Sequence, residues 1–492
     1  MLARIPQGSP RDRWGQPPMG DARWRWPTWP MTMTSTDTPT RLSASEAAQH
    51  TRADRNRAVD LYRALAMIVV AAGHWLGMVM VLQDGELEAG NLLDFSPEYG
   101  WITWIGQVMP LFFFVGGFAS ATSLLSAERR GMRPADWVVT RLHRMVTPAA
   151  ALAGFWVAGV LIAALLGGFG TATMAAAGAA IPLWFLANYT IDTALAPFTF
   201  RWFRERPRVL VGGLVFAFAI GEAASFAHVP VLGQLNWIVG WLGFQVAGFA
   251  WQQRKLPTGH RLVVLAASFW ALAVAAVHFG PWPSVMLHHG GLEHSPTHPP
   301  STALLLFGFA YSLTAAALAP AVDRFLARST RAWRLTIAAN GVAMSVYLWH
   351  MTAAIVVGGI ALGVGLIPAV EPGTSAWWAT KPPFLLANLL LLVPIVRLVA
   401  PIEQRALLGG ARAWKGGTGS MLATAAILSV SVKSWSSSSP GLLVAGLVGT
   451  IAVYRLALGR SARLSMATPD PRGGTPRSHR GRTRTVRRPR SR

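Results

Sequence analysis

Long apolar stretches alternate with short polar connections along most of the 492-residue chain. Ten of the stretches approach the ~20 residues that an α-helix needs to cross a bilayer. They cover residues 59–81, 101–125, 146–166, 181–199, 209–227, 233–251, 261–279, 302–320, 336–360 and 384–400. Glycine and alanine are frequent inside them, as is typical of helices that pack closely in lipid. The pattern predicts an all-α polytopic membrane protein with about ten transmembrane helices in one bundle.

Basic residues are distributed unevenly among the connections, and their distribution predicts the orientation of the helices. The first connection, 83–100, holds five acidic residues and no Lys or Arg, and the other odd-numbered connections are nearly free of both. The even-numbered connections contain Arg129, Arg130, Arg133, Arg141, Arg144, Arg201, Arg204, Arg206, Arg208, Arg254, Lys255, Arg261, Arg324, Arg328, Arg331 and Arg334. Because short cytoplasmic loops carry an excess of Lys and Arg, we expect a plasma-membrane protein whose N-terminus is cytoplasmic.

The composition agrees with a membrane protein, and it limits the chemistry. The chain is 52% hydrophobic and 13% charged, against about 25% charged in soluble domains. Fourteen of its 23 net positive charges lie in 1–57 and 459–492, and no nucleic-acid-binding motif accompanies them. We therefore expect disordered basic tails near anionic lipid and no nucleic-acid partner. The absence of cysteine excludes thiol catalysis, disulfides and cysteine metal sites.

The same pattern divides the chain into four regions. Residues 1–57 form an N-terminal tail that we expect to be disordered, and 58–405 form the membrane domain. Residues 406–464 form an extension with one or two apolar segments, whose topology the charge rule leaves open. Residues 465–492 form an Arg-rich tail.

The first apolar stretch, "DLYRALAMIVVAAGHW" (60–75), contains three ionisable side chains. At 3.6 residues per turn, the eleven residues from Arg63 to His74 make close to three turns, so the two side chains share a helix face. Asp60 precedes Arg63 by one turn on that face, and His74 lies roughly 16 Å further along the axis. Ionisable groups inside membranes face a protein interior or a water-filled path. A polar stripe from the cytosolic entrance to near the midplane is therefore expected.

Six segments in this order resemble the acyltransferase family 3 membrane proteins. The first is Arg63 and His74 with ten residues between them, a hallmark of the family's first helix. The others are "MPLFFFVGGF" (109–118), "RLHRMVTP" (141–148), "PLWFLANY" (182–189), "NGVAMSVYLWH" (340–350) and "PIEQR" (401–405). Together they cover residues 57–405, and the family's helix number agrees with the hydrophobic pattern.

The resemblance implies transfer of an acyl group, often acetyl, from cytosolic acyl-CoA (acetyl-CoA) to a hydroxyl of a carbohydrate or secondary metabolite. It implies that His74 is the catalytic residue, acting either as general base or as a transient acyl carrier. Arg63 would meet the donor or polarise the thioester, and Arg141 and Arg144 would bind the phosphates of coenzyme A. Imidazole suits proton transfer near neutral pH, and guanidinium groups suit phosphates. The lipid bilayer, the donor and the acceptor are the expected partners, and no metal is expected.

Other ionisable residues are weaker candidates. His350 either lines the same cavity as His74 or is a packed core histidine, and Asp60 would lie at the cytosolic mouth. Glu222, inside the fifth stretch, needs a cavity or a basic partner, and orienting His74 is one possible role. Glu403 would close the cytosolic end by pairing with an arginine. The connection 288–300 holds four histidines whose spacing matches no compact zinc motif, so a loop that shapes acceptor access is favoured.

A transporter or flippase is the alternative function, in which Arg63 and His74 would form an ion relay. A transferase needs a path from the basic loops to His74 and consumes the thioester, whereas a transporter needs a gated site and ignores it. No internal repeat is visible, which counts mildly against a secondary transporter. A pseudoenzyme that retains only the scaffold is the third and weakest option.

Overall fold

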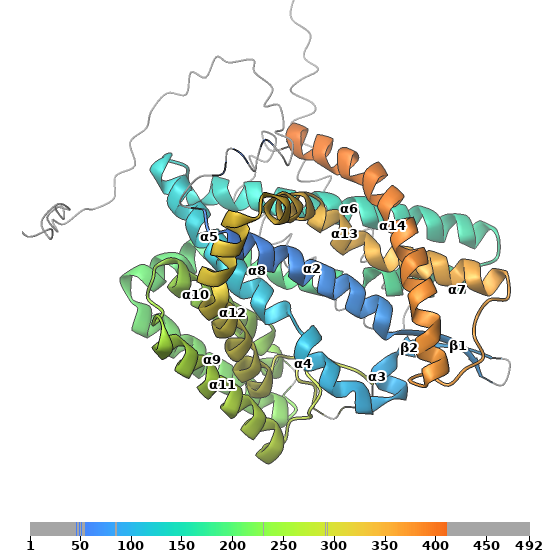
Figure 1. Cartoon of the computed structure of the whole chain (residues 1–492), viewed down its shortest axis with the longest axis horizontal. Helices are drawn as coiled ribbons and strands as arrows, with labels where there is room; N and C mark the ends of the chain where they lie inside the picture. Colours follow the sequence, from blue (N-terminus) through green and yellow to red (C-terminus); the bar gives the residue numbers. More distant parts are fainter. Residues whose placement is uncertain are drawn as a thin grey trace, which may run out of the picture. The chain divides into compact units, whose positions relative to one another are not determined.

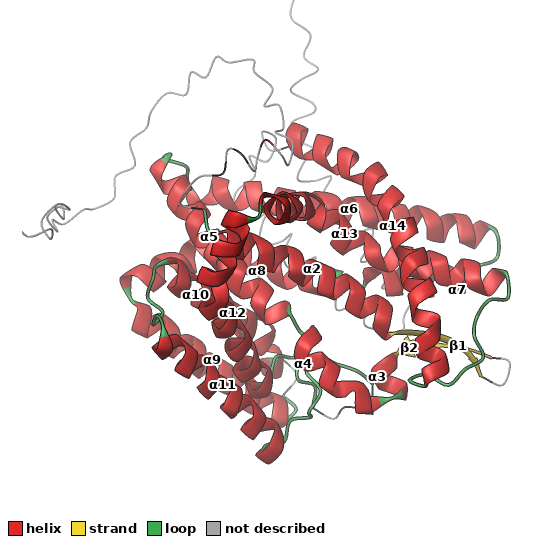
Figure 2. Cartoon of the chain, in the orientation of Figure 1, coloured by secondary structure: helices red, strands yellow, loops and turns green. Residues whose placement is uncertain are grey.

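The computed structural model describes residues 46, 49, 51 and 55–410, apart from 84–85, 230, 291 and 293, with the backbone alone for 83 and 402–410. Within this part, helices dominate and two strands form one small sheet, as Figure 2 shows. Most of the tail expected at 1–57, the tail at 465–492 and most of the extension at 406–464 lie outside the described residues. The described part is therefore the all-α assembly that the apolar pattern predicts.

The long helices follow one another through the chain with short connections (Figure 1). They are α2 (Arg57–Gly77), α5 (Met109–Arg129), α6 (Pro134–Leu165), α8 (Leu183–Glu205), α9 (Pro207–Phe226), α10 (Asn236–Gln252), α11 (His260–Phe279), α12 (Thr302–Arg328), α13 (Thr330–Gly363) and α14 (Ser375–Gly410). Shorter elements are α3 (Leu92–Phe95), α4 (Thr103–Gly106), α7 (Phe169–Ala180) and the 3₁₀ turns η1 (Pro97–Ile102) and η2 (Leu232–Gln234).

Eight helices in the described part are long and apolar enough to cross a membrane, or nine when α7 and α8, which meet at a 42° bend, count as one span. Each of the ten predicted stretches overlaps one long helix. The sixth stretch, 233–251, corresponds to α10, whose 17 residues fall just short of an 18-residue span. The structure thus confirms a multi-pass membrane protein with close to the expected number of helices.

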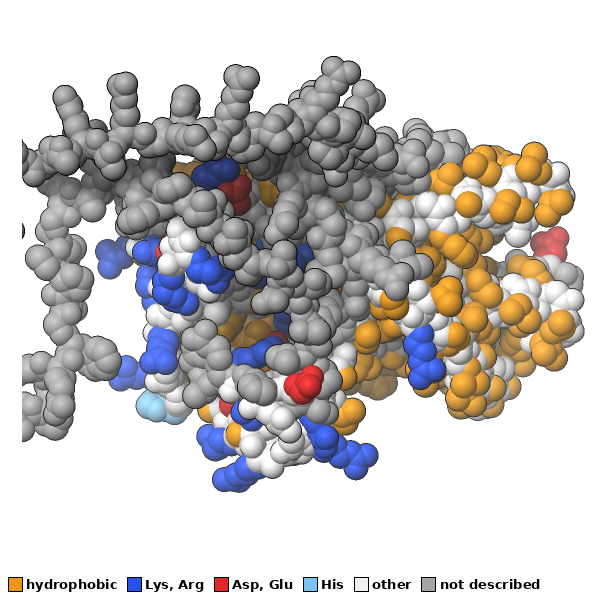
Figure 3. All heavy atoms as spheres, turned by 90° about the horizontal axis from the view of Figure 1, so that it is seen from above, with side chains coloured by type: hydrophobic (Ala, Val, Ile, Leu, Met, Phe, Trp, Pro, Cys, Tyr) orange, Lys and Arg blue, Asp and Glu red, His pale blue; other side chains and the backbone are white. Residues whose placement is uncertain are grey.

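The surface separates into apolar and basic regions. Figure 3 shows hydrophobic side chains over one part of a face and Lys and Arg side chains gathered on another. Exposed apolar side chains include Leu165 at 88%, Met174 at 74% and Val215 at 64% exposure. Because water disfavours so much exposed hydrocarbon, these residues indicate a lipid-facing surface.

Contacts between distant segments draw the basic connections together. Arg204 in α8 pairs with Glu128 in α5 at 3.0 Å. The ammonium of Lys255 lies 4.5 Å from the ring centroid of Phe203 in α8. At the start of α2, Arg57 donates to the carbonyl of Leu326 in α12 at 3.0 Å. Segments far apart in the sequence but alike in charge therefore meet in the fold.

The first helix is shorter than predicted, because α2 ends at Gly77 and not at residue 81. Met78–Gln83 forms strand β1, which pairs antiparallel with β2 (Glu86–Asn91). Val79 and Val81 point to the same side of β1, and both pack in a small buried cluster with Trp377 of α14. Hydrophobicity alone does not separate a short buried strand from the end of a helix, so the pattern missed this hairpin.

Helices α5 and α10 are in backbone contact through glycines. A Cβ atom on Gly117 would lie 2.1 Å from the carbonyl oxygen of Gln245, and one on Gly248 would lie 2.0 Å from that of Phe114. Such separations are far below contact distance, so both positions exclude any larger side chain. Close approach of small residues is a principal source of helix association in lipid.

We expect Gly117→Ala to destabilise the protein by ~1–3 kcal/mol or more, because α5 and α10 must separate to admit a methyl group. Thermal unfolding of the purified chain should show a lower midpoint for this variant. Gly213→Ala in α9 is the matched control, since a Cβ there meets nothing within 4 Å. Equal midpoints for the two variants would contradict the close packing.

Candidate functional site

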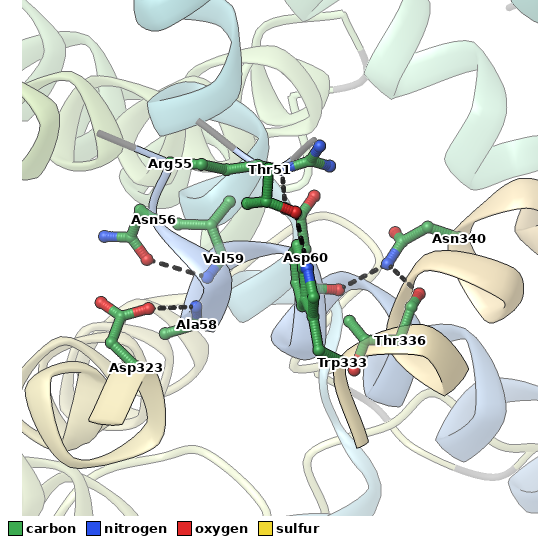
Figure 4. A network of polar contacts seen from close by, with 10 residues as sticks. All are labelled: Thr51, Arg55, Asn56, Ala58, Val59, Asp60, Asp323, Trp333, Thr336 and Asn340. Carbon is green, nitrogen blue, oxygen red and sulfur yellow. Dashed lines mark hydrogen bonds and ion pairs between the residues drawn. The ribbon is translucent and has the colours of Figure 1, made fainter. Parts of the chain in front are cut away.

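Helix α2 begins in a network of polar contacts that holds it against α12 and α13 (Figure 4). Asp323 accepts a hydrogen bond from the backbone N–H of Ala58 at 2.8 Å, and Asn56 caps the helix by accepting from Val59 at 3.1 Å. These bonds satisfy two of the amide groups that every helix start leaves free. They fix the end of α2 from which the predicted polar stripe starts.

Asp60 belongs to this anchoring network. Its carboxylate pairs with Arg55 at 2.7 Å, and its backbone carbonyl accepts from Asn340 of α13 at 2.7 Å. The guanidinium of Arg55 also lies 5.3 Å from the ring centroid of Trp333. Asp60 therefore lies one turn before Arg63, as predicted, but its carboxylate is engaged by Arg55.

Three arginines from α2 and α6 form a group of positive charge. Arg141 donates to Ser123 of α5 at 2.5 Å and lies over the ring of Trp137. The positive charges of Arg63 and Arg144 both act on Arg141, which places the three guanidinium groups near one another. Within the described part of the chain, none of the three forms an ion pair with a carboxylate. Like charges held together without counter-charges are a typical arrangement for binding an anion.

The two predicted histidines meet between α2 and α13. Nδ1 of His74 lies 2.9 Å from Nε2 of His350, and the rings stack with centroids 5.0 Å apart and planes 19° apart. Trp75 adds a second link, because its indole N–H donates to the carbonyl of His350 at 3.0 Å. His350 is fully buried, whereas His74 is partly exposed. His74 lies in the last turn of α2, closer to the helix end than the predicted span implied.

The contacts of His350 assign the protons of both rings. Nδ1 of His350 lies 2.7 Å from the backbone carbonyl of Tyr347, which can only accept, so this nitrogen carries a proton. In a neutral His350, Nε2 is then the acceptor, and Nδ1 of His74 must donate to it. Nε2 of a neutral His74 consequently carries a free lone pair. Among the described residues, that nitrogen has no hydrogen-bond partner.

A buried lysine closes the opposite end of α2. Lys381 in α14 is 5% exposed, and its ammonium donates to the carbonyl of Met78 at 2.6 Å. The backbone N–H of Met78 in turn donates to the carbonyl of His74. The ammonium also lies 3.9 Å from the ring centroid of Trp377, and no carboxylate pairs with it in the described part. Lys381 thus holds the turn that carries His74.

Glu222 contacts the start of α12 and not the histidine pair. Its carboxylate accepts from the backbone N–H of Thr302 at 2.7 Å and from the hydroxyl of the same residue. It caps the start of α12, and none of its hydrogen bonds reaches His74. The side chain of Glu403 lies outside the described residues.

The histidines of the connection 288–300 also form no site with the histidine pair. His289 lies 3.7 Å from Asp94, and His288 packs against His298. No group of three or more possible metal ligands occurs in the described part of the chain.

Several contributors to the site lacked a signal in the sequence. Ser123 and Trp75 are common residue types within apolar stretches. Tyr347 contributes through its backbone carbonyl, a group that every residue has, so no residue type in the sequence indicates it. Lys381 carried a usable signal, because it is a lone cation near the start of a long apolar stretch.

Comparisons with known proteins bear on most of this region. A family model described as an acyltransferase domain matches residues 56–397, which includes both histidines and the three arginines. A search of curated proteins and a search of solved structures each find no match.

We expect Lys381→Met to loosen the last turn of α2, because it removes a hydrogen bond from a charged donor, a contact worth ~1.5–3 kcal/mol. Part of this loss is offset, because burying methionine, unlike burying an ammonium group, carries no desolvation cost. The effect should therefore appear as faster amide exchange over residues 75–79 in hydrogen–deuterium exchange. Lys255→Met is the control, as it removes a cation that lies over an aromatic ring far along the chain. Unchanged exchange in the Lys381 variant would show that the lysine does not hold this turn.

Proposed function

Because the chain belongs to acyltransferase family 3 and is a membrane acyltransferase, we propose that it transfers an acyl group from acyl-CoA to a hydroxyl, with His74 as the general base. The observation that carries the proposal is the 2.9 Å contact between His74 and His350, together with the carbonyl of Tyr347 that orients it. A base must present a lone pair to the proton it removes, and Nε2 of His74 does so in this arrangement.

The proposed reaction needs no covalent acyl-enzyme intermediate. Nε2 of His74 takes the proton of the acceptor hydroxyl while the hydroxyl oxygen attacks the thioester carbonyl, and a tetrahedral intermediate forms. Its collapse breaks the carbon–sulfur bond, and the imidazolium returns the proton to the leaving thiolate. The products are an ester and a free thiol. His350 would accept a hydrogen bond from Nδ1 of His74 throughout, so that the ring keeps its orientation while its charge changes.

Arg63, Arg141 and Arg144 would bind the phosphates of the donor. Arg63 lies eleven residues before His74 on α2, which corresponds to roughly 16 Å along the axis. A donor with phosphates at one end and the thioester at the other could span that separation in an extended form. The arrangement also requires the arginine end of α2 to be cytoplasmic, in agreement with the basic connections.

The transporter alternative does not explain the two features that define the site. The alternative relay consists of Arg63 and His74, but no hydrogen bond in the described part of the chain joins them, and His74 contacts His350 instead. A fixed lone pair on His74, with three guanidinium groups of α2 and α6 that form no ion pair in the described part of the chain, is better suited to a reaction than to passage of an ion.

Substitution of the histidines should separate chemistry from packing. His74→Gln keeps a polar side chain without a base, and we expect transfer from labelled acetyl-CoA to fall by ~10²–10⁴-fold. His350→Gln still offers an acceptor to Nδ1 of His74, whereas His350→Leu does not. We therefore expect kcat to fall much less for the glutamine than for the leucine, with little change in donor KM.

His278→Gln is the control for this series, because His278 is exposed at the end of α11 and contacts neither histidine. Transfer at the parent rate by His74→Gln would show that His74 is structural. Equal kcat values for His350→Gln and His350→Leu would show that His350 does not orient His74.

The arginine group should govern donor affinity. We expect Arg141→Ala together with Arg144→Ala to raise the KM for acetyl-CoA by more than about tenfold, because charged phosphate contacts are lost. Steady-state kinetics with varied donor would measure this, and kcat should change less than KM. Arg201→Ala is the matched control, since Arg201 is exposed and already paired with Glu205 at 2.8 Å. An unchanged donor KM in the double variant would assign these arginines to membrane topology alone.

A further inference from the structure

A cavity of about 280 Å³ lies apart from the histidine pair, where α9 ends and α10 and α12 begin. The connection between α11 and α12 closes it. Its lining includes Glu222, Phe226, Asn236, Trp282, His294 and His298. The volume is just below the ~300–1,000 Å³ typical of sites for drug-sized ligands, so it suits a single small ring.

Two polar side chains at this cavity lack partners among the described residues. Asn236 is fully buried, and neither its amide oxygen nor its amide nitrogen forms a hydrogen bond. The indole N–H of Trp282 is likewise buried and unpaired. Buried polar groups are almost always hydrogen-bonded, since each unmet group costs ~1–3 kcal/mol. The cavity is the place from which a bound molecule could supply these missing partners.

Glu222 gives the cavity wall a fixed acceptor. Thr302 holds the carboxylate through its N–H and its hydroxyl, which leaves about half of the four lone-pair positions free. No Lys or Arg lines the cavity. Burial and the neighbouring His288 lower the pKa of His298 to about 4, so this ring is neutral near pH 7. The wall therefore offers a negative group, neutral donors and acceptors, and no fixed positive charge.

Aromatic rings complete the lining. Phe226 contacts His294 edge-on at 4.6 Å and lies 6.3 Å from Trp282. His298 stacks on Trp237 at 4.8 Å. A ligand with an apolar C–H face could pack on such rings while its edge forms hydrogen bonds.

We propose that this cavity binds a neutral, hydroxyl-rich ring, such as a sugar unit. A hydroxyl both donates and accepts, so one ring can donate to Glu222, accept from the indole of Trp282 and bond both atoms of the Asn236 amide. An anion would meet the charge of Glu222. An alkylammonium ion would pair with Glu222 but would offer no acceptor to Trp282 or Asn236. This assignment goes beyond acyl transfer and does not depend on the role of His74.

The cavity and the histidine pair lie on two sides of one aromatic segment of α8. Trp184 contacts His298 edge-on at 5.8 Å, whereas the next residue, Phe185, contacts Tyr347 at 5.4 Å. Tyr347 is the residue whose carbonyl orients His350. Neither His74 nor His350 lines the cavity, so the ring bound there is not the group that reacts at His74. It belongs either to a separate saccharide or to a part of the acceptor that is not acylated.

Ligand-observed NMR on the full chain in phosphatidylethanolamine nanodiscs tests the assignment, because sugar-headgroup detergents would compete. Methyl glucoside, methyl galactoside and N-acetylglucosamine are the probes, and choline is the cationic comparison. We expect saturation transfer to the ring protons of at least one glycoside and not to choline. Asn236→Leu and Trp282→Phe should each weaken binding at least about tenfold. Trp270→Phe is the matched control, because that indole N–H bonds Thr314 and does not line the cavity.

Trp282→Phe removes the N–H together with part of the indole and keeps an aromatic ring, and Trp270→Phe matches that loss of volume, so the variant tests the site even where Asn236→Leu fails to fold. Binding of choline alone, absence of glycoside binding, or equal binding by parent and folded Trp282→Phe would overturn the proposal. Where a glycoside binds, its effect on acyl transfer identifies the source of the ring. A raised acceptor KM assigns the ring to the acceptor, and an unchanged KM assigns it to a separate saccharide; both results support a sugar site. Loss of transfer in His74→Gln is a separate result that leaves this one unaffected.

Discussion

A backbone carbonyl can accept a hydrogen bond but never donate one, and this constraint at Tyr347 decides the character of the site. It requires a proton on Nδ1 of His350, which makes Nε2 of that ring an acceptor and turns Nδ1 of His74 into a donor. The free lone pair of the two histidines therefore lies on Nε2 of His74. A carboxylate in the place of His350 would hold the same orientation and would stabilise an imidazolium more strongly. A neutral histidine orients His74 without adding a charge inside the membrane.

The geometry of this pair depends on how α2 is held at its two ends. Its first turn is capped by Asn56 and by Asp323 of α12, and its last turn is joined through Met78 to Lys381 of α14. A helix that is fixed at both ends cannot rotate, so Arg63 and His74 keep their common face. Asp323 and Lys381 come from two different helices, and the position of the site therefore depends on how α12 and α14 pack against α2.

Packing in lipid supplies that rigidity by a different route from packing in water. Apolar side chains gain little from leaving lipid for a protein interior, so helices associate through close contact and polar links. The glycines of α5 and α10 bring two backbones together, and the exposed leucines and valines are left facing outward. The few buried polar groups are correspondingly valuable. Most of them are paired, and two of those without partners among the described residues, Asn236 and Trp282, line the cavity at the end of α9.

The sequence by itself determined the helical class, the approximate spans and the shared face of Arg63 and His74, because hydrophobic length and helical period are local properties. It also singled out His350, although its pairing with His74 across 276 positions depends on how α2 and α13 pack. Tertiary structure alone decided the hairpin after Gly77, since a short buried strand and a helix end have the same hydrophobicity. It also placed Glu222 on Thr302 and Lys381 on Met78. These contacts join segments that lie far apart in the sequence, and no hydrophobic periodicity indicates which segments meet. Only the folded structure could therefore assign them.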